Sequence, residues 1–131
     1  MGIRKALEQE YDYEIVDEFL DHFEIMTDVM EPAIIAMEKL ESREEKIHEL
    51  FRIFHNIKSA TSFLKLEKIA LLAQLAEEVM EELRARPDTV NEAVIDWLLV
   101  VSDQMRLWYG QIASDEEALS HTDPKILHMP E

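Results

Sequence analysis

Hydrophobic residues recur along the chain at steps of three and four positions, the spacing that places them on one face of an α-helix. Such stripes cover positions 12–40, 43–64, 69–86 and 94–113. The connections between them are short, which favours antiparallel neighbours. The pattern predicts an all-α protein, an antiparallel up-and-down four-helix bundle in which each helix buries its stripe in a shared core.

Proline and capping signals refine the helix ends. Pro32 falls inside the first stripe, so we expect a kink near 28–31 or a break into two helices, because proline removes a backbone donor and clashes with the preceding turn. Ser42-Arg43-Glu44-Glu45 is a capping box, which predicts a helix start at about Arg43. Thr89-Val90-Asn91-Glu92 is a second capping box and predicts the start of the last long helix.

The two ends of the chain carry weaker patterns. Residues 1–11 are expected to fray or to add a short helical turn before a bundle domain at 12–120. Ser114-Asp115-Glu116-Glu117 can cap a short fifth helix that runs to about Ser120. The polar segment 121–131 contains two prolines and is expected to be a loose tail.

The second helix has two chemically different faces around His55. Its hydrophobic face is formed by Leu50, Phe51, Phe54, Ile57, Thr61 and Leu64. The opposite face is formed by His48, Arg52, His55, Ser59 and Ser62. Lys58 lies nearly on that outer face, one turn after His55. An exposed imidazole beside an ammonium, on a surface of small side chains, suggests a place where a phosphoryl group sits and a partner docks.

Helix register places acidic and amide side chains opposite His55. In a hairpin of the second and third helices with its turn near 65, residue numbers at one level add to about 130. His55 is then level with about Leu75, and the nearby residues outside the buried stripe are Gln74, Glu77 and Glu78. A carboxylate that accepts the Nδ1 proton fixes the imidazole tautomer and leaves the Nε2 lone pair free. Glu77 is the candidate for that role.

Composition limits the class of protein and its partners. The 131 residues suit one domain, and 47% of them are hydrophobic, enough for one core. The net charge is −16, with eleven acidic and no basic residues from Glu8 to Glu38, so we expect neither nucleic acid nor an anionic membrane as a partner. The chain has no cysteine and no long apolar run at its start, which predicts a cytoplasmic protein.

Glycine and metal-ligand spacing bear on catalysis. No glycine lies between Gly2 and Gly110, so the chain lacks a glycine-rich phosphate loop and is expected to have no ATP site of its own. Glu45 and His48 have the Glu-x-x-His spacing of di-iron bundles, but that design needs a second motif and two further inward glutamates. We therefore expect no metal site and no bound cofactor.

The segment His55–Leu64 resembles the histidine-phosphotransfer (HPt) domain signature, His-x-hydrophobic-Lys-Gly-small-small. Asp17–Phe23 followed by Glu31-Pro32, and then Glu49–Arg52, are similar to the first two helices of the phosphotransfer domain that opens chemotaxis histidine kinases. The resemblance covers about positions 12–113.

The resemblance implies a phosphorelay intermediate of a two-component signalling system. By position, His55 is the phosphoacceptor, Lys58 the cation that neutralises the phosphoryl group, and Glu77 the carboxylate that orients the imidazole. Gln74 occupies a position that is often histidine in that family. The histidine accepts its phosphoryl group from a kinase ATP-binding domain or from a receiver aspartate, and passes it to a receiver aspartate. Mg²⁺ and ATP would come from the partner domains.

Two departures from the family pattern affect the expected docking surface, which comprises Arg52, Ser59, Ser62 and Lys65. Ser59 and Lys65 stand where the family usually has glycine. Serine is still small, so a receiver can approach but has less room. A lysine that adopts the turn conformation of glycine costs about 1 kcal/mol.

The sequence is also compatible with other functions. One alternative is a helical interaction or adaptor module that keeps the bundle and its receiver contacts without phosphate. The phosphotransfer hypothesis also leaves two possibilities open: a free-standing carrier, or a piece of a chemotaxis-type histidine kinase.

Overall fold

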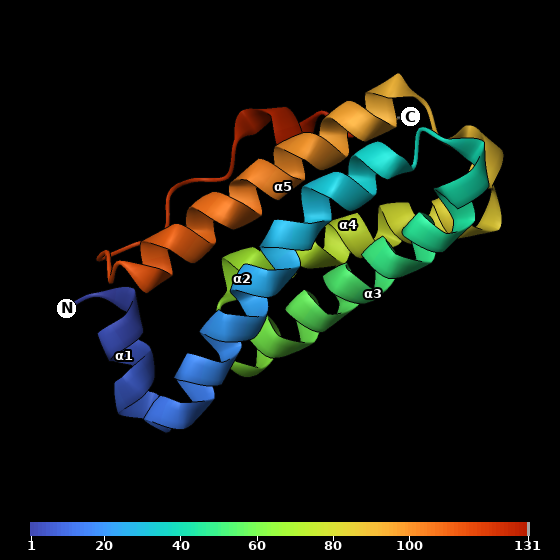
Figure 1. Cartoon of the computed structure of the whole chain (residues 1–131). Coiled ribbons are helices and arrows are strands. Elements are labelled where there is room, and N and C mark those ends of the chain that lie inside the picture. The colour runs from blue at the N-terminus through green and yellow to red at the C-terminus, as the bar shows by residue number, and fades with distance from the viewer. Residues whose placement is uncertain (131) are drawn as a thin grey trace.

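The computed structural model describes residues 1–130 (Figure 1). Its helices are α1 (Ile3–Glu10), α2 (Tyr13–Ala36), α3 (Leu40–Phe63), α4 (Glu67–Ala85) and α5 (Glu92–Ala113). Two short 3₁₀ helices, η1 (Pro87–Thr89) and η2 (Pro124–Leu127), follow α4 and α5. The described residues contain no β-strand.

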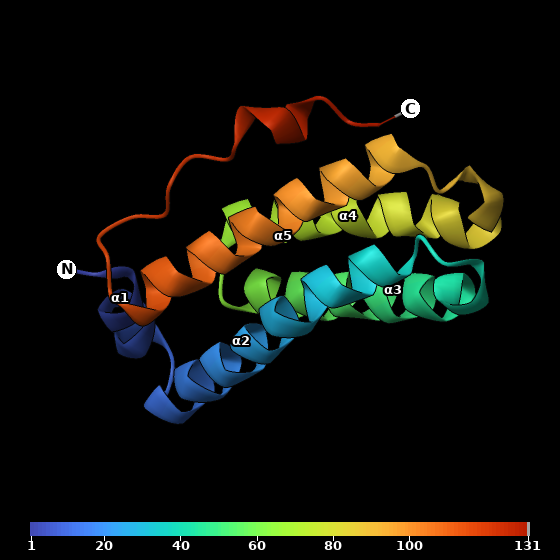
Figure 2. The same cartoon turned by 45° about the horizontal axis from the view of Figure 1, so that its top comes forward.

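The four long helices form the antiparallel bundle that the hydrophobic pattern predicts. α3 packs on α4, α4 on α5, α5 on α2 and α2 on α3, so the helices close a ring around one core (Figures 1 and 2). The largest side chains that are fully buried in this core include Trp108, Phe23, Phe54 and Met30. The all-α class and the bundle architecture are therefore confirmed.

Pro32 does not divide α2. The helix runs without interruption from Tyr13 to Ala36, so of the two predicted outcomes the break is wrong. Proline leaves the carbonyl four residues earlier without its helical donor. The neighbouring carbonyl of Thr27 accepts a hydrogen bond from Arg106 Nη2 at 3.3 Å, which ties this stretch of α2 to α5.

The start of α3 differs from the prediction. The helix begins at Leu40 rather than Arg43, and Ser42, the predicted cap, does not cap it. Ser42 Oγ donates to the carbonyl of Ala36 at 2.8 Å, and Arg43 Nε donates to the carbonyl of Met37 at 2.9 Å. Both side chains thus satisfy open carbonyls at the end of α2. The capping-box prediction is wrong because the Ser42 and Arg43 side chains bind carbonyls at the end of the preceding helix instead of capping α3.

At the start of α5, the cap is a different residue of the predicted capping motif. Asn91 is the cap, since its Oδ1 accepts from the backbone N–H of Val94 at 2.9 Å. Thr89 belongs instead to the 3₁₀ turn and donates to the carbonyl of Arg86 at 2.7 Å. The predicted helix is present, but asparagine and not threonine caps it.

The N-terminal segment is an anchored helix rather than a frayed end. Leu7 of α1 is buried, and the backbone N–H of Ile3 donates to the carbonyl of Glu116 at 2.8 Å. The backbone N–H of Lys5 donates to Asp115 Oδ1 at 3.2 Å, so a carboxylate lies at the start of α1, where a helix favours negative charge. Of the two expectations for residues 1–11, fraying is wrong and a short helix is present.

The same contacts explain why no short helix forms at 114–120. Asp115 has a φ of 58°, and the N–H of Glu116 reaches back to the carbonyl of Gln111 at 2.9 Å, an arrangement that ends a helix. A side chain at Gly2 would collide with Asp115, so the close approach of the two chain ends requires glycine there. The predicted fifth helix is wrong, and the C-terminal helical turn lies later, at η2.

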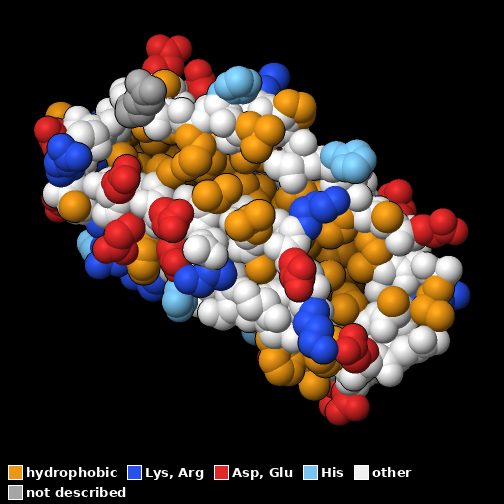
Figure 3. All heavy atoms as spheres, turned by 180° about the vertical axis from the view of Figure 1, so that it is seen from behind, with side chains coloured by type: hydrophobic (Ala, Val, Ile, Leu, Met, Phe, Trp, Pro, Cys, Tyr) orange, Lys and Arg blue, Asp and Glu red, His pale blue; other side chains and the backbone are white. Residues whose placement is uncertain are grey.

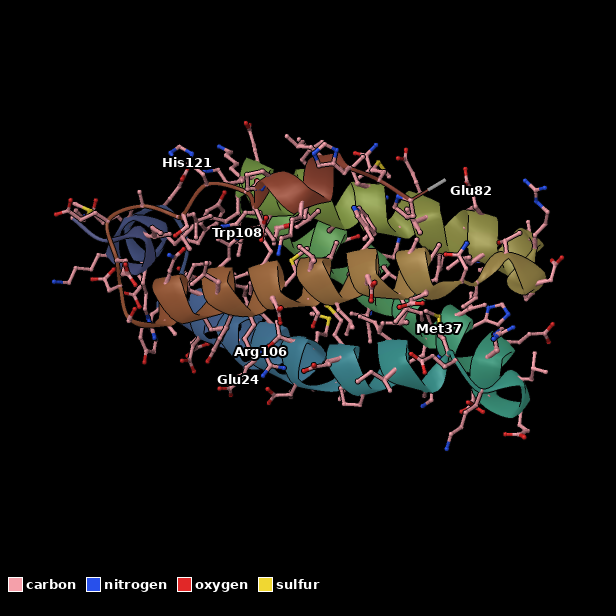
Figure 4. The ribbon with its side chains drawn as sticks, turned by 90° about the horizontal axis from the view of Figure 1, so that it is seen from above. Glu24, Met37, Glu82, Arg106, Trp108 and His121 are labelled. Carbon is pink, nitrogen blue, oxygen red and sulfur yellow. The ribbon has the colours of Figure 1, made fainter. Side chains whose placement is uncertain are left out.

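The C-terminal segment is anchored at η2, where Ile126 is buried, rather than loose; Glu131 lies outside the described residues. Trp97 Nε1 donates to the carbonyl of Ile126 at 3.0 Å, and Trp108 Nε1 donates to the carbonyl of Ser120 at 2.9 Å. Figure 4 shows this segment running beside α5 near Trp108. The indole N–H of Trp97 thus finds its acceptor inside the predicted tail, and that of Trp108 finds it at the residue just before the tail.

Some hydrophobic side chains remain at the surface. Seen from behind, they form a band along the molecule between charged residues (Figure 3). Exposed examples on α4 and the C-terminal segment are Leu71, Leu127 and Met129. None of the helices within residues 1–130 is long and apolar enough to cross a membrane.

Candidate functional site

His55 lies on the outer face of α3, in the C-terminal half of the helix. Phe54 and Ile57, on either side of it in the sequence, are fully buried against the bundle core. Because residues turn by about 100° per position in a helix, these anchors direct His55 away from the core. Its side chain is 52% exposed. The imidazole is therefore held on a rigid helix and remains accessible to a reactant.

Glu77 of α4 contacts the imidazole directly. His55 Nδ1 and Glu77 Oε2 are 2.6 Å apart, and the Glu77 side chain is only 13% exposed. No hydrogen bond from the described part of the chain reaches His55 Nε2. With Nδ1–H donated to the carboxylate, the Nε2 lone pair faces solvent. The juxtaposition predicted from helix register is confirmed, while the role of Glu77 in a reaction stays a prediction.

Lys58 binds the second oxygen of the same carboxylate. Its Nζ donates to Glu77 Oε1 at 2.6 Å, so the carboxylate bridges the imidazole and the ammonium. The sequence places Lys58 beside His55 but does not predict this pairing. The ammonium keeps two further N–H groups, and its side chain is half-buried at the edge of the site.

The electrostatics of Glu77 favour its charged form. Partial burial by itself raises the pKa of a carboxyl, but hydrogen bonds from Lys58 and His55, helped by their charges, outweigh it and hold the pKa of Glu77 below its ordinary value. Glu77 is therefore a carboxylate at neutral pH. At that pH, Glu77 Oε2 can accept a hydrogen bond from His55 Nδ1–H.

The predicted docking residues are exposed, and most of them meet in one place. A shallow groove beside His55 is lined by Lys58, Ser59, Ser62, Lys65, Glu67, Ala70, Leu71 and Gln74. Gln74 faces this groove from α4 and makes no hydrogen bond to His55. Arg52 is exposed one turn before His55, outside the groove. That a partner docks here stays a prediction.

Lys65 makes the α3–α4 turn without glycine. Its φ is 60°, in the left-handed region, and the N–H of Leu66 donates to the carbonyl of Thr61 at 2.8 Å to close the end of α3. Its ammonium donates to Glu10 at 3.2 Å, and this hydrogen bond, with the charge of Glu10, raises the pKa of Lys65. The residue thus adopts the glycine-like turn and also links the groove to α1.

The sequence pattern missed two groups near the imidazole. Phe51, assigned to the buried stripe, is half-buried, and its ring lies nearly parallel to that of His55. Arg84 of α4 places its guanidinium over the Phe51 ring. An aromatic residue four positions before an exposed histidine is a signal for the first contact. No sequence pattern near Phe51 or Arg84 predicts the contact between these two side chains.

Comparison with known proteins gives two matches. A family model described as the Hpt domain matches residues 14–115, from the second residue of α2 to just past the end of α5, and so includes His55, Lys58 and Glu77. The chemotaxis protein CheA of Treponema pallidum (strain Nichols) is 23% identical over 93 residues, which cover 71% of this chain. The matched region spans 12% of the length of that relative. No solved structure matches the chain.

Proposed function

The chain belongs to the Hpt domain family, and we propose that His55 is the residue on which it carries a phosphoryl group. The family and the likeness to CheA indicate a role in phosphotransfer within two-component signalling. The observation that supports the assignment to His55 is the 2.6 Å contact between His55 Nδ1 and Glu77 Oε2 on an otherwise accessible imidazole.

The proposed step is an in-line transfer to Nε2. The lone pair of His55 Nε2 attacks the phosphorus of the donor, an acyl phosphate of a receiver aspartate or the γ-phosphate of ATP on a kinase. The bond from phosphorus to the donor oxygen breaks, and that oxygen leaves with the electron pair. Nδ1 keeps its proton, and the carboxylate of Glu77 balances the positive charge that develops on the imidazole ring. Transfer to a receiver aspartate is the same step with donor and acceptor exchanged.

Lys58 is proposed to offset the charge of the phosphoryl group. Its ammonium is held by Glu77 on one side, which fixes its position before any phosphoryl group arrives. The remaining N–H groups are available to phosphoryl oxygens, and such charge-assisted bonds are stronger than neutral ones. The same carboxylate would therefore orient both the nucleophile and the cation.

The proposed partners are a histidine kinase catalytic domain and a receiver domain. They would approach over Arg52, Ser59, Ser62 and Lys65, and the kinase domain would bring ATP and Mg²⁺. Because the chain corresponds to a small part of CheA, the kinase domain belongs either to the same polypeptide or to a separate one. The proposed location is the cytoplasm, where such a kinase finds its ATP.

The test is labelling by kinase and receiver domains encoded in the same genome. Radioactive ATP with a kinase domain, or a phosphorylated receiver, should transfer label that is stable to alkali and labile to acid. We expect His55→Gln to abolish this label, and His48→Gln, an exposed histidine two turns earlier on α3, to retain it. Label on His55→Gln at the wild-type rate would contradict the assignment. Receiver binding that is unchanged in His55→Ala, with no label on the wild type, would instead favour an adaptor module.

A further inference from the structure

A phenyl ring and a guanidinium accompany the His55 imidazole along the contact between α3 and α4. Phe51 lies one turn before His55, with the two ring planes 10° from parallel and their centroids 6.3 Å apart. Such an offset parallel pair is a favoured aromatic arrangement. From α4, Arg84 places Cζ 4.4 Å from the centroid of the Phe51 ring, within the range of a cation–π contact. The Phe51 ring therefore contacts both helices.

The contact with Glu77 alone restrains the imidazole only loosely. One hydrogen bond at Nδ1 tolerates small rotations about the Cα–Cβ and Cβ–Cγ bonds of an exposed side chain. Such rotations move Nε2, which lies on the far side of the ring. A flat neighbour restricts the plane of the ring. The stacked face of Phe51 supplies this second constraint, so the two contacts together fix the direction of the Nε2 lone pair.

Arg84 acts on Phe51 rather than on His55. Its guanidinium lies over the Phe51 ring, and Nη1 is 3.9 Å from Glu81 Oε2 on the same helix. A planar cation that is held in this way limits the rotation of the phenyl ring beneath it. The order of contacts is therefore Arg84 to Phe51, and Phe51 to His55.

We propose that Phe51 and Arg84 are positioning residues for His55: Phe51 sets the plane of the imidazole, and Arg84 holds Phe51. The proposal rests on the proposed function of His55 for its consequence in phosphotransfer. Its structural part, the state of the imidazole ring, is measurable without any phosphoryl donor.

The first experiment measures the imidazole tautomer by ¹⁵N NMR in the unphosphorylated protein. We expect the wild-type His55 proton to reside on Nδ1, and Phe51→Leu to raise the share of the Nε2–H form because the ring is less well held against Glu77. Phe51→Tyr keeps a flat ring and should match the wild type. Unchanged ¹⁵N shifts of His55 in Phe51→Leu would overturn the proposal. Urea unfolding identifies the variants that remain folded, and Arg84→Gln, at a more exposed position, serves if Phe51→Leu does not fold.

The second experiment measures transfer from phosphoramidate, a donor too small to need a docking surface. Its phosphoryl group moves to Nε2, and ammonia leaves with the electron pair and takes up a proton. We expect Phe51→Leu to lower the maximal rate by about threefold to tenfold, with the half-saturating donor concentration unchanged. Arg84→Gln should lower it by about twofold. Arg106→Gln, which removes a guanidinium from the α2–α5 contact, should leave the rate unchanged.

A double variant separates a chain of contacts from two independent effects. If Arg84 acts through Phe51, Arg84→Gln should have no further effect in the Phe51→Leu background. Rate losses that multiply in the double variant would overturn the role given to Arg84. A wild-type protein that takes up no phosphoryl group would count against the proposed function instead, and the tautomer measurement would still decide the positioning of His55.

Discussion

Polar groups join the elements of this protein in two different ways. Between α3 and α4, His55 and Lys58 meet Glu77 through side chains at a partly open surface. At α5, the indoles of Trp97 and Trp108 reach backbone carbonyls of the C-terminal segment from inside the protein. The His55 side chain is 52% exposed, whereas Trp108 is fully buried.

The difference follows from what each contact has to do. A nucleophile must be reached by its reactant, so the contacts that orient it lie at the surface, where ion pairs contribute little to stability and respond to pH and salt. A buried indole N–H must instead be satisfied, because an unpaired donor in the core is costly. The α3–α4 contact should therefore govern reactivity, and the contact of α5 with the C-terminal segment should govern stability.

Trp108→Ala should have the largest effect, and on stability alone. It removes a fully buried indole and leaves a cavity, so the free energy of unfolding should fall by about 3–5 kcal/mol. Urea unfolding measures this loss. The rate of phosphoryl uptake per folded molecule should stay at the wild-type value, and a fall in that rate would show that the two regions are coupled.

Glu77→Gln should have the opposite profile. The amide is uncharged and no longer balances the positive charge that develops on the imidazole, so phosphoryl uptake at His55 should slow. We expect about 10- to 100-fold, the range that holds for carboxylates orienting metal-binding histidines. Initial labelling rates measure it, with Glu78→Gln, an exposed neighbour on α4, as the control. Equal rates in Glu77→Gln and the wild type would remove the role proposed for this carboxylate.

Trp97→Phe tests the second indole contact, and we expect it to lower stability less than Trp108→Ala does. It keeps an aromatic ring but removes the donor to the carbonyl of Ile126, so the free energy of unfolding should fall by about 1–2 kcal/mol. Leu127→Ala, at an exposed position next to that carbonyl, should change it much less. The comparison fails if both variants unfold at the same urea concentration.

Acid should weaken the α3–α4 contact first, by a modest amount. Because the pKa of Glu77 is lower in the folded protein, its carboxylate contributes stability that is present above the unfolded value of about 4.3. That contribution is lost as the pH falls through the folded pKa. The difference in free energy of unfolding between the wild type and Glu77→Gln should therefore shrink as the pH falls from about 5 through the folded pKa of Glu77. A difference that stays constant over that range would contradict the lowered pKa.

The site was more predictable than the helix ends, for a physical reason. α3 and α4 are regular helices joined by a tight turn at Lys65, so their register follows from rise per residue and places Glu77 opposite His55. Capping motifs are local patterns with several acceptors within reach. Ser42 uses the carbonyl of Ala36, which lies in the preceding helix, and the motif alone does not reveal that choice.

Hydrophobic periodicity predicts the long helices, their order and the all-α bundle, because it is a property of neighbouring residues. Helix register then brings Glu77, together with Gln74 and Glu78, to the level of His55. The packing of the two chain ends and the contact of Arg84 with Phe51 arise only in the folded bundle. These contacts join residues far apart in the chain. Their partners are selected by the shape and the unsatisfied groups of the assembled bundle, which no local pattern records.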